Sequence, residues 1–302
     1  FLVYMVQLTW PMIAVGWVVN LFQRGTASIV RIDELLKQKP SIADEPGAVD
    51  EGISGEVEFR SLTFAYPGAP AVLHDINLRI PVGSSLAIVG PTGSGKSTLV
   101  SLIPRLHDAA PGMVLIDGKP VRHYMLASLR GGIGFVPQET FLFSETIRKN
   151  IAFGRPDATL EEVEGAAEVA HIATEILEFP KGFDTMVGER GVTLSGGQKQ
   201  RTSIARAVIR DPRILILDDA LASVDTYTEE RILSGLREAM KGRTTIFISH
   251  RISTARNADQ IAVLVDGRIA ELGTHEELLT RNGYYTSLYE KQRLEEELSV
   301  AT

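Results

Sequence analysis

Residues that could bind phosphate gather in one short segment of the chain, which reads GPTGSGKST. It follows the apolar stretch SLAIV and precedes LVSLI, so a loop between a strand and a helix is expected. Glycines let such a loop curl until successive backbone N–H groups converge on phosphate oxygens. Lys96 can place its charge on the β- and γ-phosphates, and the Ser97 hydroxyl can ligate Mg²⁺. The segment predicts a P-loop rather than an accidental glycine-rich turn, with the nucleotide-binding residues Gly90, Pro91, Thr92, Gly93, Ser94, Gly95, Lys96, Ser97 and Thr98.

A second element suited to phosphate chemistry is the segment RILILDDA, which runs from Arg213 to Ala220. Its four apolar residues predict a buried strand, which delivers Asp218 to the edge where ligands bind in open α/β sheets. There Asp218 can hold Mg²⁺ through a water molecule. A buried strand that ends in aspartate is common, so it is the pairing with the P-loop that indicates a nucleoside triphosphatase.

The segment LSGGQKQR, which precedes Asp218, decides between the families that share a P-loop. Here the sequence resembles the ATP-binding domain of ABC transporters, whose signature reads LSGGQ. The resemblance implies ATP and Mg²⁺ as ligands and a second ABC subunit as partner, because the family's signature binds the γ-phosphate held by the other subunit's P-loop. Without the resemblance, Ser-Gly-Gly predicts no more than a turn. The signature residues are Leu194, Ser195, Gly196, Gly197 and Gln198.

Four more residues match landmarks of the family in the expected order. The resemblance gives Tyr66 the role of stacking on adenine, and an ordinary strand aromatic is the alternative. It gives Gln138 a contact with Mg²⁺ and with the membrane domain, and it puts Asp225 in the loop that crosses the dimer interface. His250, which follows the apolar stretch TTIFIS, matches the histidine that contacts the γ-phosphate. A lone histidine is usually structural, so this role depends on the whole series.

The residue after the Mg²⁺-binding aspartate departs from the family, because most members have glutamate where this chain has Asp219. That glutamate acts as the general base, and the oxygens of aspartate reach roughly 1.5 Å less far. A general base contributes about 10²–10⁴-fold in rate, so we expect ATP to bind while hydrolysis is slow. Such a site resembles the degenerate subunit of heterodimeric multidrug and lipid exporters. The alternatives are a homodimer with a fully active Asp219 site and a regulatory subunit that binds ATP without hydrolysing it. The predicted catalytic residues are Asp219, Gln138 and His250, and the predicted Mg²⁺ ligands are Ser97, Gln138 and Asp218.

The composition of the chain excludes several other functions. Its net charge of −7 offers no basic face for nucleic acid, which disfavours the soluble ABC proteins of DNA repair and translation. The chain has no cysteine, so disulfides and thiolate catalysis are excluded. Its hydrophobic fraction of 44% suits a protein with a sizeable core.

The stretch from Phe1 to Phe22 carries no charge. A helix of this length rises roughly 33 Å, enough to cross a membrane, and Pro11 is expected to kink it. The alternatives are a buried helix of a soluble protein and a signal peptide, which would need a basic start and a cleavage site. Arg24 and Arg31 follow, which favours a cytoplasmic C-terminal side. In ABC exporters the sixth transmembrane helix runs directly into the ATP-binding domain. The resemblance therefore implies a multi-pass protein of the cell (inner) membrane, with most of its transmembrane domain outside this chain.

The expected organisation has three parts. Residues 1–24 are the end of the last transmembrane helix, residues 25–52 a helical extension and linker, and residues 53–302 the ABC nucleotide-binding domain, with a helical subdomain at about 140–210. Strands that alternate with helices predict an α/β fold. It consists of a P-loop NTPase core with a RecA-like parallel sheet, an antiparallel β subdomain and an α-helical signature subdomain. Strands are expected at residues 57–64, 76–80, 86–89, 113–116, 214–217, 245–248, 261–265 and 268–272.

Overall fold

The computed structural model describes residues 1–189, 193–224 and 226–300, and it divides into the units Phe1–Ala43 and Asp44–Thr302. The first unit is built on one helix, α1 (Leu2–Lys37), which contains Pro11 without being ended by it and buries none of its side chains. This helix includes both the apolar stretch and the extension that the sequence predicted beyond it. It is long enough and apolar enough to cross a membrane.

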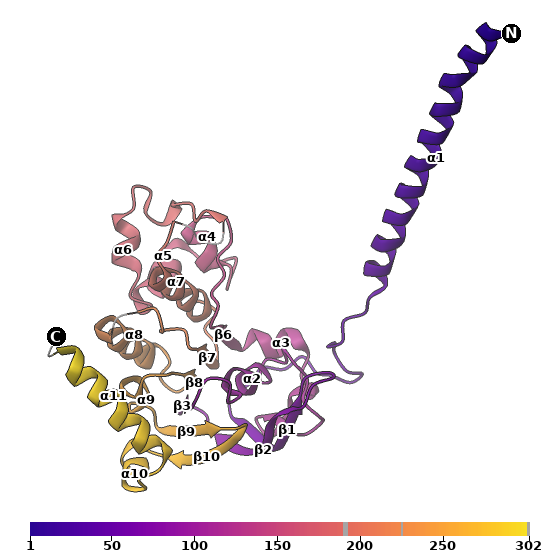
Figure 1. The fold of residues 1–302 in the computed structure, drawn as a ribbon. Coiled ribbons are helices and arrows are strands. Elements are labelled where there is room, and N and C mark those ends of the chain that lie inside the picture. The colour runs from indigo at the N-terminus through magenta and orange to yellow at the C-terminus, as the bar shows by residue number, and fades with distance from the viewer. Residues whose placement is uncertain (190–192, 225, 301–302) are drawn as a thin grey trace. The chain divides into compact units, whose positions relative to one another are not determined.

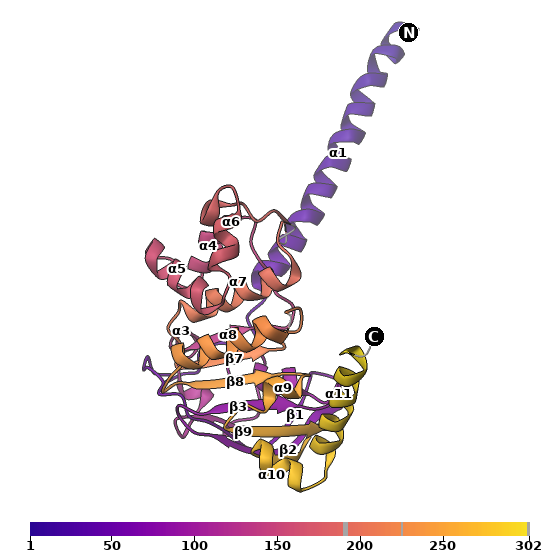
Figure 2. The ribbon, with the colours of Figure 1, turned by 90° about the vertical axis from the view of Figure 1, so that its left-hand side faces the viewer.

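The second unit is organised around a six-stranded sheet with the order β10-β9-β3-β8-β7-β6. The strands from β9 to β6 are parallel, and β10 is antiparallel to β9. Figure 2 shows β7, β8, β3 and β9 side by side. The bounds are β3 (Ser85–Val89), β6 (Ile133–Val136), β7 (Ile214–Asp218), β8 (Thr244–Ile248), β9 (Gln260–Val265) and β10 (Arg268–Gly273).

The central strands of this sheet are mostly apolar because both faces are covered. Side chains of successive residues point to opposite faces of a strand. In β3, Ala87 and Val89 belong to one hydrophobic cluster, whereas Leu86 and Ile88 belong to another. The sheet thus separates two cores, as expected for a parallel sheet between layers of helices or a second sheet. This arrangement confirms the predicted α/β class.

Strand β6 was not among the strands predicted from the sequence. Its second residue is Gly134, and glycine weakens a strand pattern. A Cβ at this position would lie 3.0 Å from the ring of Pro212 and 3.1 Å from the carbonyl oxygen of Ala207. The glycine leaves room for the close approach of a neighbouring segment, and it weakens the sequence pattern of the strand that leads to Gln138.

A second, four-stranded antiparallel sheet has the order β2-β1-β4-β5. It consists of β1 (Val57–Ala65), β2 (Ala71–Ile80), β4 (Val114–Ile116) and β5 (Lys119–Pro120), and β2 begins earlier than predicted. The backbone N–H of His74 in β2 donates to the carbonyl of Gly267 at 2.8 Å, which joins the two sheets. The antiparallel β subdomain of the prediction is confirmed.

The end of the extension and linker predicted over residues 25–52, and the residues that follow it, fold against the rest of the second unit. Val49 forms a parallel bridge with Tyr124, and the side chain of Ile53 is only 6% exposed. The Asp117 carboxylate accepts hydrogen bonds from the backbone N–H groups of residues 54–56. The compact unit accordingly begins at Asp44, earlier than the boundary expected near Ile53.

The helices of the second unit fall into two groups. Helices α4 (Ile147–Ala152), α5 (Leu160–Val169), α6 (Ala173–Glu178) and α7 (Gly196–Val208) form a lobe beyond the β6 side of the sheet (Figure 1). The others pack nearer the sheets: α2 (Lys96–Ser101), α3 (Leu126–Gly131), α8 (Thr226–Ala239), α9 (Ile252–Ala255), α10 (His275–Thr280) and α11 (Tyr284–Val300). A 3₁₀ turn at Val121–His123 contacts β4, and another at Gly182–Asp184 contacts α4 and α6 of the lobe. The lobe is the predicted α-helical signature subdomain.

Candidate nucleotide-binding site

The glycine-rich loop joins β3 to α2, as the sequence predicted. Lys96 begins α2, and its Nζ donates to the carbonyl oxygens of Gly90 at 2.9 Å and of Pro91 at 2.8 Å. The side chain curls over the loop that it follows. Gly90 has a φ of +143°, and a Cβ there would lie 2.0 Å from the carbonyl oxygen of Leu264, so only glycine fits. Burial lowers the pKa of the Lys96 ammonium, and Asp219 and Asp218 oppose this shift.

Two carboxylates stand at the end of β7, opposite the loop. Asp218, which is 6% exposed, accepts a hydrogen bond from the Ser97 hydroxyl at 2.9 Å. Asp219 follows with a φ of +48°, and the Gln138 amide donates to its Oδ2 at 3.5 Å. Burial raises the pKa of both carboxyl groups. Perturbed acids beside a buried lysine are typical of a functional site.

These side chains line one pocket of about 190 Å³. The structure therefore brings together the predicted catalytic and Mg²⁺-binding residues and most of the P-loop, whereas Gly90, Pro91 and Ser94 do not line the pocket. Val72 and Ile248 also line the pocket and were not predicted, because apolar strand residues carry no chemical signal. The full lining is Val72, Thr92, Gly93, Gly95, Lys96, Ser97, Thr98, Gln138, Asp218, Asp219, Ile248 and His250.

The donor set in this pocket fits Mg²⁺ accompanied by a nucleotide. Among the residues that the structure describes, no group of three or more histidine, cysteine, aspartate or glutamate side chains could hold a metal by itself. The pocket offers instead a hydroxyl, an amide and a carboxylate, from Ser97, Gln138 and Asp218. Mg²⁺ takes few protein oxygens and completes its shell with phosphate and water.

Tyr66 lies beside the P-loop but does not line this pocket. Its hydroxyl is 3.0 Å from Oγ1 of Thr98. Its ring makes edge contacts with Phe64 and His107, at centroid distances of 5.1 and 5.0 Å. The position is compatible with a ring next to the nucleotide, and stacking on adenine stays a prediction.

The signature forms the start of α7. Ser195 is the N-cap, and its Oγ accepts from the backbone N–H of Gln198 at 3.2 Å. The Gln198 side chain accepts from the backbone N–H of Ser195 at 2.9 Å, which completes a capping box. Leu194 is buried, and no signature residue lines the P-loop pocket. Asp225 lies outside the described residues.

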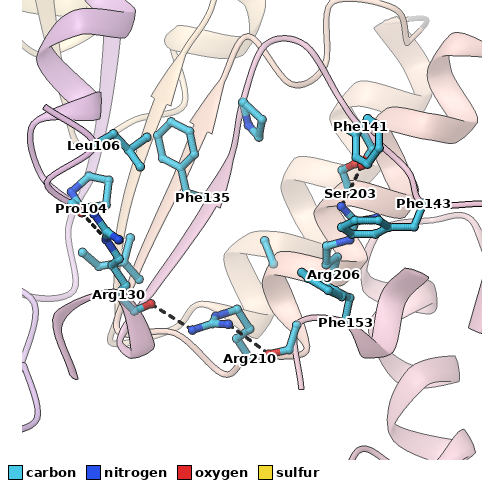
Figure 3. A pocket seen from close by; sticks show the side chains of 14 residues that line it. Pro104, Leu106, Arg130, Phe135, Phe141, Phe143, Phe153, Ser203, Arg206 and Arg210 are labelled. Carbon is cyan, nitrogen blue, oxygen red and sulfur yellow. Dashed lines mark hydrogen bonds between the residues drawn. The ribbon is translucent and has the colours of Figure 1, made fainter. Parts of the chain in front are cut away.

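A larger pocket of about 380 Å³ lies between the end of β6, α4 and α7 (Figure 3). Phe141 and Phe153 line it and are 53% and 59% exposed. Arg206 lies between rings in this groove, with its guanidinium 5.6 Å from the centroid of Phe143 and 5.9 Å from that of Phe153. It donates at 2.8 Å to the carbonyls of Phe141 and Asn150, and burial lowers its pKa to about 10. The groove was not predicted, because its residues come from separate segments.

Comparison with known proteins agrees with this geometry. Residues 73–222 match the ABC transporter family. The chain is 44% identical to a probable multidrug resistance ABC transporter ATP-binding/permease protein of Bacillus subtilis, over 97% of this chain and 50% of the relative. It is 46% identical to an ATP-dependent lipid A-core flippase of Desulfotalea psychrophila, over 97% of this chain and 51% of the relative.

Among solved structures, a bacterial Atm1-family ABC exporter with ATP bound matches with a TM-score of 0.86 and 42% identity, over 96% of this chain and 51% of that chain. The chain thus spans about half the length of the relatives that it matches. P-loop, signature, fold and likeness agree, and the chain belongs to the ABC transporter family, of which it carries the ATP-binding domain.

Proposed function

We propose that this chain is the ATP-binding part of an ABC exporter and that ATP bound at its P-loop drives the closure of two such domains. The observation that carries the proposal is the single pocket in which Lys96, Ser97, Asp218 and His250 meet. Lys96 would exchange its bonds to the loop carbonyls for bonds to phosphate oxygens. Mg²⁺, held by Ser97, Gln138 and Asp218, would neutralise charge on the phosphates.

The partner in this proposal is a second ABC subunit. The signature residues at the start of α7 lie outside the P-loop pocket of their own chain. The Ser195 oxygen accepts a hydrogen bond within the cap, and its O–H proton stays available as a donor. The signature would therefore contact the γ-phosphate of ATP held by the other subunit, and the two chains would share two ATP molecules.

Hydrolysis at this chain's own P-loop is proposed to be slow. The Asp219 carboxylate is one methylene shorter than the usual glutamate, and it sits on a left-handed residue with a φ of +48°. Burial raises its pKa, which strengthens it as a base but does not extend its reach. We favour a heterodimer in which the partner supplies the faster site. A homodimer with an active Asp219 site and a subunit that only binds ATP are the alternatives.

The membrane is the remaining partner. Helix α1 has an apolar 18-residue window with a mean hydropathy of 1.6, which supports its assignment as a transmembrane helix. The exposed phenylalanines of the groove in Figure 3 support a contact with membrane-domain segments, because exposed apolar patches usually mark interfaces. The proposed location is the cell (inner) membrane, as a multi-pass protein with its ATP-binding domain in the cytoplasm.

The test of the proposal is a comparison of two substitutions in the transporter assembled with its partner. Asp219→Glu is expected to raise ATP turnover at this chain's site by about tenfold or more, because it restores the reach of the base. Replacing the partner's catalytic glutamate by glutamine is expected to remove most of the turnover of the unmodified transporter. If Asp219→Glu changes nothing while the partner's substitution leaves hydrolysis intact, the slow-site proposal is wrong.

A further inference from the structure

A side chain of the C-terminal helix α11 contacts the loop that carries His250. Gln292 on α11 accepts a hydrogen bond through Oε1 from the backbone N–H of Ile252 at 2.7 Å. Its Nε2 donates to the backbone carbonyl of His250. We propose that Gln292 is a positioning residue, which holds His250 at the nucleotide pocket and makes α11 part of the ATPase site. The proposal rests on the function proposed above.

The backbone groups that Gln292 satisfies belong to a helix start. Helix α9 begins at Ile252, and its N-cap Arg251 makes no side-chain capping bond. The first N–H groups of a helix have no partner within the helix. Here the N–H of Ile252 finds its partner on another helix, far along the chain. The side-chain amide of Gln292 therefore takes the place of a local cap and fixes the backbone on both sides of Arg251.

The opposite side of the same loop is fixed by side chains. Arg251 donates through Nη1 to the carbonyl of Val224 at 3.0 Å and forms an ion pair with Glu229, which is 3% exposed. The hydroxyl of Thr254 also donates to Glu229. Ser249 accepts from the backbone N–H of Arg251 at 3.0 Å. The loop is thus held between α8 and α11, and Gln292 is its described side-chain partner from α11.

The loop held in this way faces the reactive end of the pocket. His250 and Asp219 both line the P-loop pocket and a second pocket of about 160 Å³ next to it. Burial raises the pKa of the Asp219 carboxyl, and His250 is the neighbour that most opposes this shift. A displacement of the His250 backbone would therefore move the ring relative to Asp219 and to phosphate bound by Lys96.

Helix α11 is anchored to the rest of the domain by contacts near its start. Tyr285 in its first turn is fully buried, and its hydroxyl is 2.8 Å from Nδ1 of His275. The backbone N–H groups of Tyr284 and Tyr285 donate to the Glu271 carboxylate. These anchors do not involve Gln292. A substitution at Gln292 should therefore release the His250 loop without detaching the helix.

The first test is ATP turnover by the assembled transporter in lipid vesicles, with the partner's nucleotide site silenced. Gln292→Met keeps the length of the side chain and removes both hydrogen bonds. It is expected to lower kcat on the order of 10–100-fold, because small misplacements of a catalytic group have effects of this size. The KM for ATP should stay within about twofold, since the P-loop is untouched. The matched control is Glu290→Met, at an exposed position on the same helix, which should leave both constants unchanged.

Two further readouts separate positioning from a general loss of structure. Hydrogen exchange at the Ile252 amide should accelerate in Gln292→Met and stay slow in Glu290→Met, and an unchanged rate would overturn the proposal. In a His250→Ala background, Gln292→Met should cause no further loss of kcat, because both changes remove the same contribution. A further loss of the same size in that background overturns the positioning role.

A wild-type transporter without ATPase activity contradicts the proposed function and this inference together. An active wild type with an unaffected Gln292→Met variant contradicts the inference alone.

Discussion

Two helices of this domain begin at or next to glycines in segments suited to phosphate, but their first turns are built differently. Helix α2 begins after Gly95, which has a φ of +99° and provides no side-chain cap. Helix α7 begins after Ser195, whose side chain forms a reciprocal capping box with Gln198. The start of α2 is therefore built to receive a ligand, whereas the start of α7 is already satisfied within the chain.

The two helix starts also differ in the charges around them. Near α2 the buried Lys96 and Asp218 both have pKa values that burial moves against their charged forms. Near the start of α7 the charge is paired instead, because Arg201 forms an ion pair with Glu175. Strain and buried charge are kept where they serve function, and they lower stability there. The contrast suggests that the P-loop gives up stability for binding, while the signature is a preformed surface for a second subunit.

The largest effect on ATPase activity is expected from a substitution at the start of α2. Lys96→Met removes the ammonium that holds the P-loop carbonyls and would bind the phosphates. We expect ATPase activity to fall about 10²–10³-fold, as for the loss of one strong donor at a transition state. Turnover and calorimetric ATP binding measure the effect. Lys149→Met, at an exposed lysine paired with Glu145, is the control and should change neither. Unaltered ATP binding in Lys96→Met would show that the pocket is not a nucleotide site.

A smaller effect on stability and ATPase activity is expected from a substitution at the start of α7. Ser195→Ala removes the N-cap, which costs about 1 kcal/mol and lowers the Tm by about 2–4 °C. Thr159→Ala removes the equivalent residue of the capping box at α5 and should lower the Tm similarly. Only Ser195→Ala should also slow hydrolysis at the partner's P-loop. Equal ATPase rates in the two variants would mean that the Ser195 cap is structural only.

The same contrast explains what the sequence could predict. The P-loop and the signature are contiguous segments, so their residue types and order identify them before folding. Strands β3, β7, β8 and β9 were predicted because buried parallel strands are continuous apolar runs. The first part of β2 was missed, since Asp75 has a φ of +49° and the pairing with β1 shifts register there. Strand β6 was missed because Gly134, which sits where a neighbouring segment packs closely, weakens its strand pattern.

Features assembled from distant segments could not be predicted. The groove around Arg206 joins residues from α3, β6, α7 and the loops on either side of α4, and each of its phenylalanines alone is typical of an ordinary core residue. Gln292 meets the His250 loop across 40 residues of sequence, and a lone glutamine in a helical segment carries no signal of its own. The roles of Tyr66 and Asp225 stay predictions, the first because it lies beside the pocket and the second because it falls outside the described residues.

The smallest expected effect tests whether charge at the P-loop side lowers stability. Burial raises the pKa of Asp219 above its ordinary value of 3.8, so the charged carboxylate is less favourable in the folded protein than in the unfolded one. Asp219→Asn removes this penalty, and we expect the Tm of the nucleotide-free protein to rise by about 2 °C at neutral pH. Because a raised carboxyl pKa makes folding more favourable as pH falls, the difference from wild type should shrink on acidification. Scanning fluorimetry from neutral pH toward 4.5 measures both changes. A Tm that falls in Asp219→Asn, as it should in Ser195→Ala, would mean that attraction to Lys96 and His250 outweighs burial, and that the two helix starts do not differ in stability as inferred.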